Sequence, residues 1–365
     1  MKVLRALIPL LAVVLVLGAG LLRAVEVVTH PYQGVTYITR TETLPRAETM
    51  HIVQIDLAAP GISFKLTPVS GTRDTVRQTT LDFLNQQNAQ VAINGHFFLP
   101  FPSSDTDSNV TGLAASQGNV YSPFEPQPIG SGYTNQSYAI IQYAPALNID
   151  AANHASIVHR DAAYPDNKHV LEPVTLWNAV SGSAQIVTNG SKTIPTYSAP
   201  GELTPGNGYS DANSWYAAVN ARTAIGLTQD AQTLVLFTVD KAGTSLGMTP
   251  GEVADMLIGG YGVYNALNLD GGGSTTMAMQ NPLTHLGEIV NLSSDSSSGR
   301  LVGSNLAVFA APVPEPGTMT LLCVGASAGM SFRLLWAGRR AMRAKRGSRW
   351  ICASANGDDA ALHRK

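Results

Sequence analysis

Short apolar runs separated by turn residues constrain the fold of this chain more than any other feature. The segments "GVTYIT" (34–39), "HIVQIDL" (51–57) and "ISFKLTPV" (62–69) are rich in β-branched residues, and Ala59-Pro60-Gly61 separates the last two. Runs of this length between turn residues predict consecutive antiparallel strands. Similar runs predict further strands over residues 90–94, 137–143, 177–188, 216–230, 233–240, 265–270 and 301–310.

Two helices are predicted among these strands. The first covers 75–87, where Thr75 and Gln78 have the spacing of a capping box. The second begins after Thr249 and is expected to end at Gly259-Gly260. We therefore expect an α+β fold in which curved, mixed or antiparallel β-sheets carry a few flanking helices. One domain over 29–311 would hold them, with a long surface excursion that contains short strands at 99–136 and a second long loop at 189–214.

Composition limits the function. The charged fraction is 13% and the formal net charge is −2, which argues against a nucleic-acid partner. The two cysteines, Cys323 and Cys352, both lie beyond the predicted domain. A thiol nucleophile, a cysteine zinc site and a disulfide framework are thereby excluded for the domain.

Both ends of the chain carry export signals. Residues 1–28 combine basic residues with an apolar run and predict a cleaved signal peptide, or else a retained anchor. Residues 312–350 contain Pro314-Glu315-Pro316, an apolar stretch and a basic cluster, and a polar tail follows at 351–365. This segment resembles a PEP-CTERM sorting tail, which implies an exosortase-like partner; a stop-transfer anchor is the alternative. Both terminal segments predict membrane contact and export to the cell envelope, the cell surface or the medium.

The stretch "NALNLDGGGSTTMAM" (265–279) is the strongest candidate site. A strand ends near Asp270, and Gly271, Gly272, Gly273 and Ser274 follow. Glycines permit positive φ and let a ligand approach the backbone, whose free N–H groups can bind an anion. A carboxylate beside an anion site suits a substrate that carries a phosphate next to the atom under attack. A purely structural turn is the alternative.

Three other polar clusters also follow or interrupt strands. They are Asn94-Gly95-His96, Ser181-Gly182-Ser183 and the basic Arg222 inside an apolar segment. His96 could titrate near neutral pH or simply be a hydrogen-bonded residue. The second cluster could be a bulge or a place of ligand approach. Arg222 needs an anionic partner if it is buried, either a phosphate or a structural Asp.

Two further charged residues belong to the candidate set. Asp240 ends its strand as Asp270 does, and glycoside cleavage commonly uses a pair of carboxylates. Arg300 precedes the last strand and could contact phosphate or a nearby Asp. Asp240, Asp270 and Asn94 offer oxygen atoms of the kind that Ca²⁺ or Mg²⁺ binds, but no ligand spacing requires a metal or a cofactor.

The order of these motifs resembles that of the phosphodiester glycosidase family, over about residues 30–310. The resemblance implies hydrolysis of a sugar-1-phosphodiester, with N-acetylglucosamine-1-phosphate linkages in an envelope or extracellular polysaccharide as the expected substrate. The sugar would be released and a phosphomonoester left. By motif, the family's site residues fall on Asn94, Gly95, Ser181, Gly182, Arg222, Asp270, Gly271, Gly272, Gly273 and Ser274. His96 and the two long loops depart from the family's pattern.

In this reading, the partner is a phosphorylated glycan. Arg222, Arg300 and the glycine-loop amides would neutralise its phosphate, and Asp270 or Asp240 would act at the sugar as nucleophile or base. His96 is a further catalytic candidate.

Two alternatives stay open. Gly243-x-Ser245-x-Gly247 has the form of a nucleophile elbow, with Asp270 and His285 in the order of a Ser-Asp-His triad. The helix start signal at Thr249-Pro250 comes too late for such an elbow. The other alternative is a surface protein that binds a glycan without cleaving it.

Overall fold

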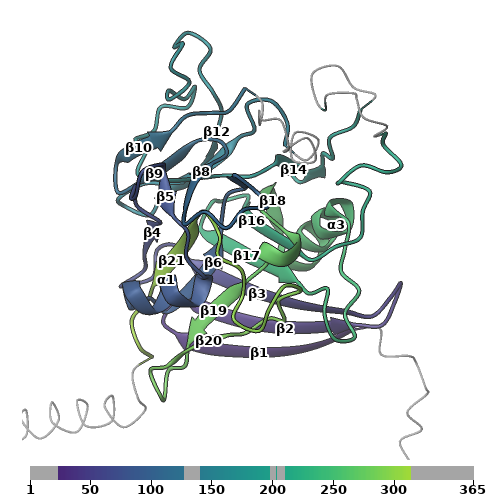
Figure 1. Ribbon diagram of the computed structural model, residues 1–365. Coiled ribbons are helices and arrows are strands. Elements are labelled where there is room, and N and C mark those ends of the chain that lie inside the picture. The colour runs from purple at the N-terminus through teal and green to yellow at the C-terminus, as the bar shows by residue number, and fades with distance from the viewer. Residues whose placement is uncertain (1–23, 127–139, 198–202, 204–209, 314–365) are drawn as a thin grey trace, which may run out of the picture. The chain divides into compact units, whose positions relative to one another are not determined.

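The computed structural model describes residues 24–126, 140–197, 203 and 210–313 (Figure 1). The chain divides into two compact units, 1–312 and 313–365, and the fold described here is that of the first. The predicted export segment up to residue 23, the sorting tail from residue 314 and the polar tail lie outside the described residues. Within the described ranges, no helix is both long and apolar enough to cross a membrane.

The largest sheet has eight strands, and each of its pairings is antiparallel. In spatial order they are β1 (Ala24–Tyr32), β2 (Val35–Glu42), β3 (Glu48–Asp56), β17 (Thr233–Val239), β16 (Arg222–Thr228), β18 (Val263–Asn268), β14 (Ala184–Thr188) and β15 (Ser191–Lys192). The strand β1 starts at Ala24, within the segment 1–28 predicted as an export signal, and its residues 24–29 and Tyr32 pair with β2.

Three smaller sheets complete the domain. The first contains β20 (Gly287–Ile289), β19 (Met277–Gln280), β6 (Val91–Asn94), β21 (Asn305–Phe309) and β4 (Ser63–Leu66). The second contains β10 (Asn119–Ser122), β9 (Ala114–Ser116), β13 (Asn178–Ser181), β11 (Ala146–Ile149) and β12 (Ala155–Val158). The third contains β5 (Thr75–Val76), β8 (Asp107–Val110) and β7 (Phe98–Leu99). The expected α+β fold with antiparallel sheets is confirmed, although helix is scarce.

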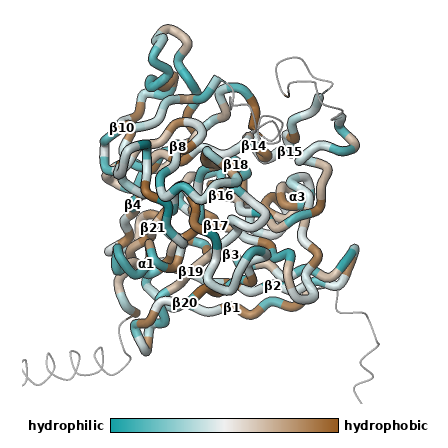
Figure 2. The backbone as a smooth tube through the Cα atoms, in the orientation of Figure 1, coloured by the Kyte–Doolittle hydropathy of each residue, from teal (hydrophilic) through white to brown (hydrophobic). Residues whose placement is uncertain are grey.

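The main core lies between the large sheet and the sheet that contains β6. Ile55 of β3, Leu267 of β18 and Ile93 of β6 are fully or almost fully buried in it. The opposite face of the large sheet packs against α3 (Pro250–Tyr261). Apolar segments accordingly run through the strands between these layers (Figure 2). Burial on both faces explains why the central strands read as continuous apolar runs rather than as alternating ones.

The helix α3 has the predicted start but not the predicted end. Thr249 and Glu252 form a complete capping box, with Pro250 at the first position. The helix continues through Gly259-Gly260 and ends at Gly262, which has φ +66°. The C-terminal signal is thus the glycine that adopts the left-handed conformation, while the two earlier glycines are tolerated inside the helix.

The helix α1 (Thr80–Gln87) begins later than predicted. Thr79 is the N-cap, and its side chain accepts a hydrogen bond from the Asp82 amide at 3.0 Å. Thr75 instead lies in β5, and its hydroxyl donates to the Gly303 carbonyl oxygen at 2.6 Å. The capping-box spacing at Thr75 was therefore a false signal, because a second threonine with a suitable partner follows it.

Three predictions for loops and strands also differ, wholly or in part, from the structure. Residues 137–139 lie outside the described ranges, and 140–143 form bends and turns rather than a strand. The predicted excursion 99–136 contains short strands, β8, β9 and β10, but it is not wholly at the surface, since Leu113 is fully buried. The predicted strand 177–188 is two strands, β13 and β14, which belong to different sheets.

Candidate active site

The loop after β18 has the tight backbone that its glycines predicted. It carries a 3₁₀ turn, η1 (Gly272–Ser274), in which Gly272 has φ +60°. The Asp270 amide donates to the Gly95 carbonyl oxygen at 3.1 Å, and the Gly272 amide donates to the Ala221 carbonyl oxygen at 2.8 Å. A Cβ atom on Gly273 would overlap the Arg300 guanidinium. The glycines thus let the loop pass close to its neighbours.

Asn94 ties this loop to two sheets. Its Nδ2 donates to the Asp270 carbonyl oxygen at 2.7 Å. Its Oδ1 accepts from Thr223 Oγ1 of β16 at 2.9 Å and from the Thr276 amide at 3.0 Å. Because the side chain is fully buried and used on both atoms, Asn94 positions Asp270 rather than presenting an open amide.

His96 lies behind the loop. Its ring nitrogens are within hydrogen-bonding distance of Ser304 Oγ (2.8 Å), the Ser181 amide (2.9 Å) and the Leu113 carbonyl oxygen (3.0 Å). Burial lowers the pKa of His96 to about 4, although the Leu113 contact acts in the opposite direction. A neutral, enclosed ring of this kind holds β6 and β13 together, which does not fit the proton-transfer role predicted for it.

Gly182 serves close packing of the backbone. A Cβ atom there would overlap the Asn268 carbonyl oxygen, which accepts a hydrogen bond from the Ser183 amide at 2.7 Å. The chain passes from one sheet to another at this point. The predicted bulge-like interruption is therefore a sheet change, and Ser181 is brought to the same place as His96.

Asp270 has the electrostatic setting of a functional carboxylate. It is 8% exposed. Burial raises its pKa to about 7, while Ser274, Arg300 and the Gly271 amide act to lower it. Arg300 donates from Nη1 to Ser274 Oγ at 3.3 Å and from Nε to Asp295 Oδ2 at 3.0 Å. Ser274 therefore lies between a carboxylate and a guanidinium.

Arg222 lies beside the loop but is enclosed. Its guanidinium donates to the carbonyl oxygens of Met248 (3.1 Å), Trp215 (2.9 Å) and Ala218. It also lies over the Trp215 ring, at 4.4 Å from the ring centroid. Burial without a carboxylate partner lowers the pKa of Arg222 to about 9. In this conformation Arg222 braces the backbone, and its predicted contact with phosphate remains a prediction.

Several buried polar atoms near the loop have no hydrogen-bond partner within the described parts of the chain. They are Ser181 Oγ, Trp215 Nε1, Arg222 Nη1 and Asn268 Oδ1. Buried polar atoms normally have hydrogen-bond partners. Several unpaired ones on neighbouring elements are therefore typical of a place where a polar ligand or water binds.

Asp240 is not in the same arrangement as Asp270. Strand β16 lies between β17 and β18, so the two carboxylates follow strands that are not neighbours. Asp240 Oδ1 accepts from Asn291 Nδ2 at 3.2 Å, and Oδ2 lies 3.4 Å from His51 Nε2. Asn291 in turn donates to the Thr275 carbonyl oxygen at 3.2 Å and accepts from the Met277 amide at 2.7 Å. Asp240 thus supports the loop from behind.

Two of the candidate oxygen ligands are already used within the protein. Asn94 Oδ1 and Asp240 Oδ1 already accept protein hydrogen bonds. In the ranges that the structure describes, no group of three or more His, Cys, Asp or Glu side chains is placed to hold a metal ion.

The alternative triad is not assembled. Ser245 Oγ donates to the Asp240 carbonyl oxygen at 2.7 Å and accepts from the Thr49 amide at 3.0 Å. It therefore stabilises a turn. His285 is an exposed residue of the turn between β19 and β20, where its amide donates to the Asn281 carbonyl oxygen at 2.9 Å. The nucleophile-elbow interpretation of Ser245 is wrong for this fold.

Sequence reasoning missed several residues of the site. Trp215, Thr223, Asn291 and Ser304 each contact a predicted residue, as described above. Thr223 follows Arg222 directly and could have been noticed. The other three lie in segments with no motif, and only the fold brings them to the loop.

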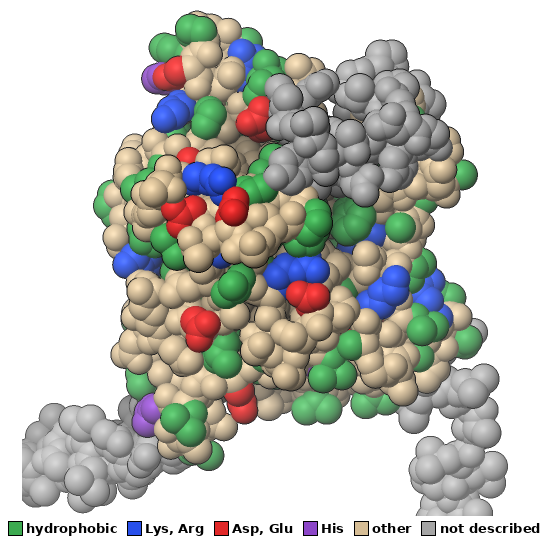
Figure 3. Space-filling model, in the orientation of Figure 1, with side chains coloured by type: hydrophobic (Ala, Val, Ile, Leu, Met, Phe, Trp, Pro, Cys, Tyr) green, Lys and Arg blue, Asp and Glu red, His purple; other side chains and the backbone are tan. Residues whose placement is uncertain are grey.

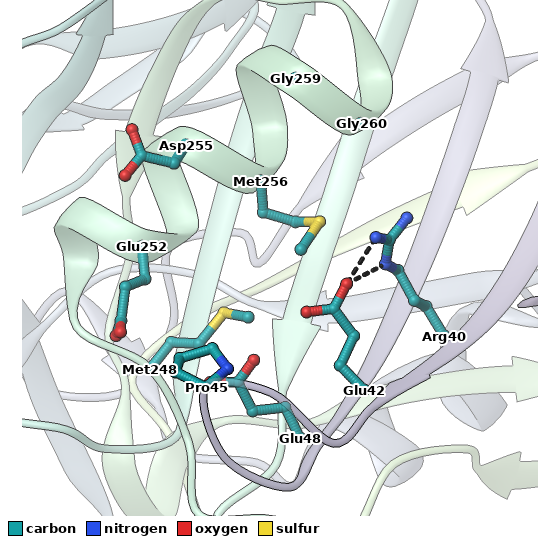
Figure 4. Close-up of a pocket in the computed structure, with 10 residues that line it drawn as sticks. All are labelled: Arg40, Glu42, Pro45, Glu48, Met248, Glu252, Asp255, Met256, Gly259 and Gly260. Atoms are coloured by element: carbon teal, nitrogen blue, oxygen red, sulfur yellow. Dashed lines mark hydrogen bonds and ion pairs between the residues drawn. The ribbon is translucent and has the colours of Figure 1, made fainter. Parts of the chain in front are cut away.

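One cavity of the domain lies away from this site. It has a volume of about 400 Å³ and lies between α3 and the β2–β3 connection (Figure 4). Its lining residues are Arg40, Glu42, Pro45, Glu48, Met248, Glu252, Asp255, Met256, Gly259 and Gly260. None of the predicted site residues is among them. On the face drawn in Figure 3, basic and acidic side chains are interspersed outside the grey atoms.

Comparison of the sequence with protein families decides the relationship. The profile of the family described as phosphodiester glycosidase matches residues 87–309. This chain belongs to the phosphodiester glycosidase family. The matched range contains the whole candidate site, from Asn94 to Arg300.

Several solved structures are similar to this family member. One is a hypothetical protein from Synechocystis, with 18% identity and a TM-score of 0.49, covering 76% of this chain and 62% of that one. Another is the catalytic domain of zebrafish N-acetylglucosamine-1-phosphodiester alpha-N-acetylglucosaminidase, auto-inhibited by its pro-peptide. It has 19% identity and a TM-score of 0.49, covering 80% of this chain and 85% of that one. A search among curated proteins finds no significant match.

Proposed function

We propose that this protein hydrolyses a sugar-1-phosphodiester between the anomeric carbon and the phosphate oxygen. Family membership supports the class of reaction. One observation supports placing the reaction at the glycine loop. The buried Asp270 carboxyl, with a pKa of about 7, and the Arg300 guanidinium both contact Ser274.

The reaction follows from these residues. Asp270 takes a proton from water as the water oxygen bonds to the anomeric carbon. The bond from that carbon to the phosphate oxygen breaks, and its electron pair leaves with the phosphomonoester. Arg300 stabilises the phosphate charge. The amides of the glycine loop were expected to do the same, but those of Asp270, Gly272, Ser274 and Thr275 already donate to protein carbonyl oxygens. A phosphomonoester is a good leaving group, so the reaction does not need a second carboxylic acid, in agreement with the position of Asp240.

The substrate and location are further parts of the proposal. We infer an N-acetylglucosamine-1-phosphate linkage in an envelope or extracellular polysaccharide. The apolar N-terminal segment and the Pro314-Glu315-Pro316 tail support export and processing by an exosortase-like enzyme. Both signals are features of the sequence.

The test is turnover by the full-length protein. We expect release of free N-acetylglucosamine from its synthetic 1-phosphate diesters, with a phosphomonoester as the second product. Asp270→Asn should lower kcat by about 10²–10⁴-fold. The matched control is Asp255→Asn, a change of an exposed carboxylate on α3, and it should leave kcat unchanged. Binding without turnover across the panel would favour the non-catalytic glycan-binding alternative.

A further inference from the structure

A cavity of about 430 Å³ adjoins the candidate site at Arg300. Two chain segments form most of its wall, 98–105 after β6 and 295–301 before β21. Asp270 is not among the lining residues, so the cavity is separate from the place where the sugar would react.

Arg300 connects the two places. One of its nitrogens, Nη1, faces the loop through Ser274, and its guanidinium lies 4.7 Å from the centroid of the Phe101 ring in the cavity wall. A phosphate bound at Arg300 has two ester substituents. If one substituent lies at Asp270, the other can extend along Phe101 into the cavity.

The wall has an apolar part within a mixed lining: Phe98, Phe101, Pro102 and Leu301 are apolar, and arginine, aspartate, serine and glycine residues complete it. The rings of Phe98 and Phe101 pack edge to face with their centroids 5.7 Å apart. Arg77 lies over Phe98 at 5.1 Å and donates to the carbonyl oxygens of Pro100 (2.6 Å) and Ser103 (3.2 Å). These contacts fix the segment, so the cavity is formed in advance of binding.

The acidic residues of the wall have cationic partners. Asp105 accepts from Arg73 at 2.9 Å, and Asp295 accepts from Arg300 at 3.0 Å. These two carboxylates are therefore already paired and do not favour binding of a cation in the cavity. Its rings, together with the half-exposed Leu301, suit an uncharged, flat or apolar group.

We propose that this cavity binds the second substituent of the phosphodiester, and that it favours an aromatic or apolar group over a small one. The proposal rests on the proposed function for the orientation of the substrate. It adds a specificity site formed by Phe101 and Leu301 on the leaving-group side of Arg300, with the buried Phe98 supporting the Phe101 ring.

The first test compares two substrates on the full-length protein. N-acetylglucosamine-1-phosphate esterified with a benzyl group should have a kcat/KM at least about tenfold above that of the methyl ester, which is about 1.4 kcal/mol. Ser104→Trp, which fills this exposed part of the wall with a large ring, should bring the ratio of the two kcat/KM values to about one. Leu283→Trp, at a residue that is 89% exposed, controls for an added surface ring.

The second test does not depend on turnover. Calorimetry should show that benzyl phosphate binds the wild-type protein at least about fivefold more tightly than methyl phosphate. Ser104→Trp should abolish that difference, and Leu301→Glu should do the same if Ser104→Trp does not fold. Equal binding of the two phosphates would overturn the cavity proposal. If the protein bound benzyl phosphate more tightly than methyl phosphate but hydrolysed neither diester, the proposed function would be contradicted and the cavity proposal would stand.

Discussion

Asp270 carries an energetic penalty that its neighbours offset only in part. Its carboxyl is buried, and only Ser274, Arg300 and the Gly271 amide favour the charged form. Since the folded-state pKa is about 7 and the ordinary value is 3.8, the folded protein retains the proton at pH values where the unfolded chain has lost it. The contribution of Asp270 to stability therefore falls as pH rises from about 4 to about 7.

The stability of Asp270→Asn should show this dependence. Above pH 7 the variant avoids a buried charge and should exceed wild type by on the order of 2–4 kcal/mol in free energy of unfolding. Below pH 4 the difference should vanish, because the wild-type carboxyl is then protonated in both states. Urea unfolding at pH 4 and pH 8 measures both values, with Asp255→Asn as the exposed control. A constant difference at both pH values would contradict the assignment.

The same carboxyl sets the expected pH dependence of activity. If Asp270 is the base, only its charged form accepts a proton from water. The kcat/KM value should then fall about tenfold per pH unit below about 7 and level off above it. A profile that falls above pH 7 instead would show that the protonated form is active, and Asp270 would be an acid.

At the scale of elements, the change of sheet between β13 and β14 depends on Gly182. An alanine there would push a methyl group into the Asn268 carbonyl oxygen, a backbone atom that cannot rotate away. We expect Gly182→Ala to lower the free energy of unfolding by about 1–3 kcal/mol and to reduce kcat, because Ser181 and His96 would shift with the chain. Gly259→Ala in α3, where nothing lies within 4 Å of the added atom, should instead raise stability by about 0.5–1 kcal/mol. Thermal unfolding of both variants would check the contrast.

The elements that sequence could predict are those with complete local signals. The start of α3 is one, since Thr249, Pro250 and Glu252 lie within one turn. The start of α1 was misplaced because Thr75 and Thr79 both precede plausible helix, and the choice depends on the distant Gly303 carbonyl. The division of 177–188 into two sheets likewise depends on Asn268, far along the chain.

The site shows the same division between local and distant information. The glycine loop and the clusters at Asn94 and Arg222 were recognisable from three consecutive glycines after a carboxylate and from polar residues next to or inside apolar runs, and the fold does bring them together. The structural roles of Asp240 and His96 could not be recognised from the sequence. Each depends on a partner from another sheet, His51 for Asp240 and Ser304 for His96, that no spacing in the sequence indicates.

For the molecule as a whole, the candidate site lies at the junction of three sheets. Asn94 ends β6 of one sheet and bonds to Thr223 of β16 in the large sheet. His96 then bonds to Ser181 at the end of β13 in another. A loop fixed by contacts among separate sheets is held more rigidly than one fixed by its own turn, which suits a site that must place a carboxylate against a sugar.

Asn94→Ala should therefore affect both stability and activity. It leaves the Asp270 carbonyl oxygen, the Thr276 amide and the Thr223 hydroxyl without this buried partner, so the free energy of unfolding should fall by about 2–4 kcal/mol. The kcat of the folded protein should fall at least about tenfold, because Asp270 is no longer held in place.

Asn148→Ala is the matched control for that experiment. Asn148 is also buried, but it lies on β11, and its side chain donates to the Thr175 carbonyl oxygen at 3.0 Å and accepts from the Trp177 amide at 2.9 Å. Its loss should lower stability by about 1–3 kcal/mol and leave kcat per folded molecule unchanged. Urea unfolding and initial rates at a temperature where both variants are folded separate the two effects. Equal losses of kcat would mean that general loosening, and not the junction at Asn94, controls the position of Asp270.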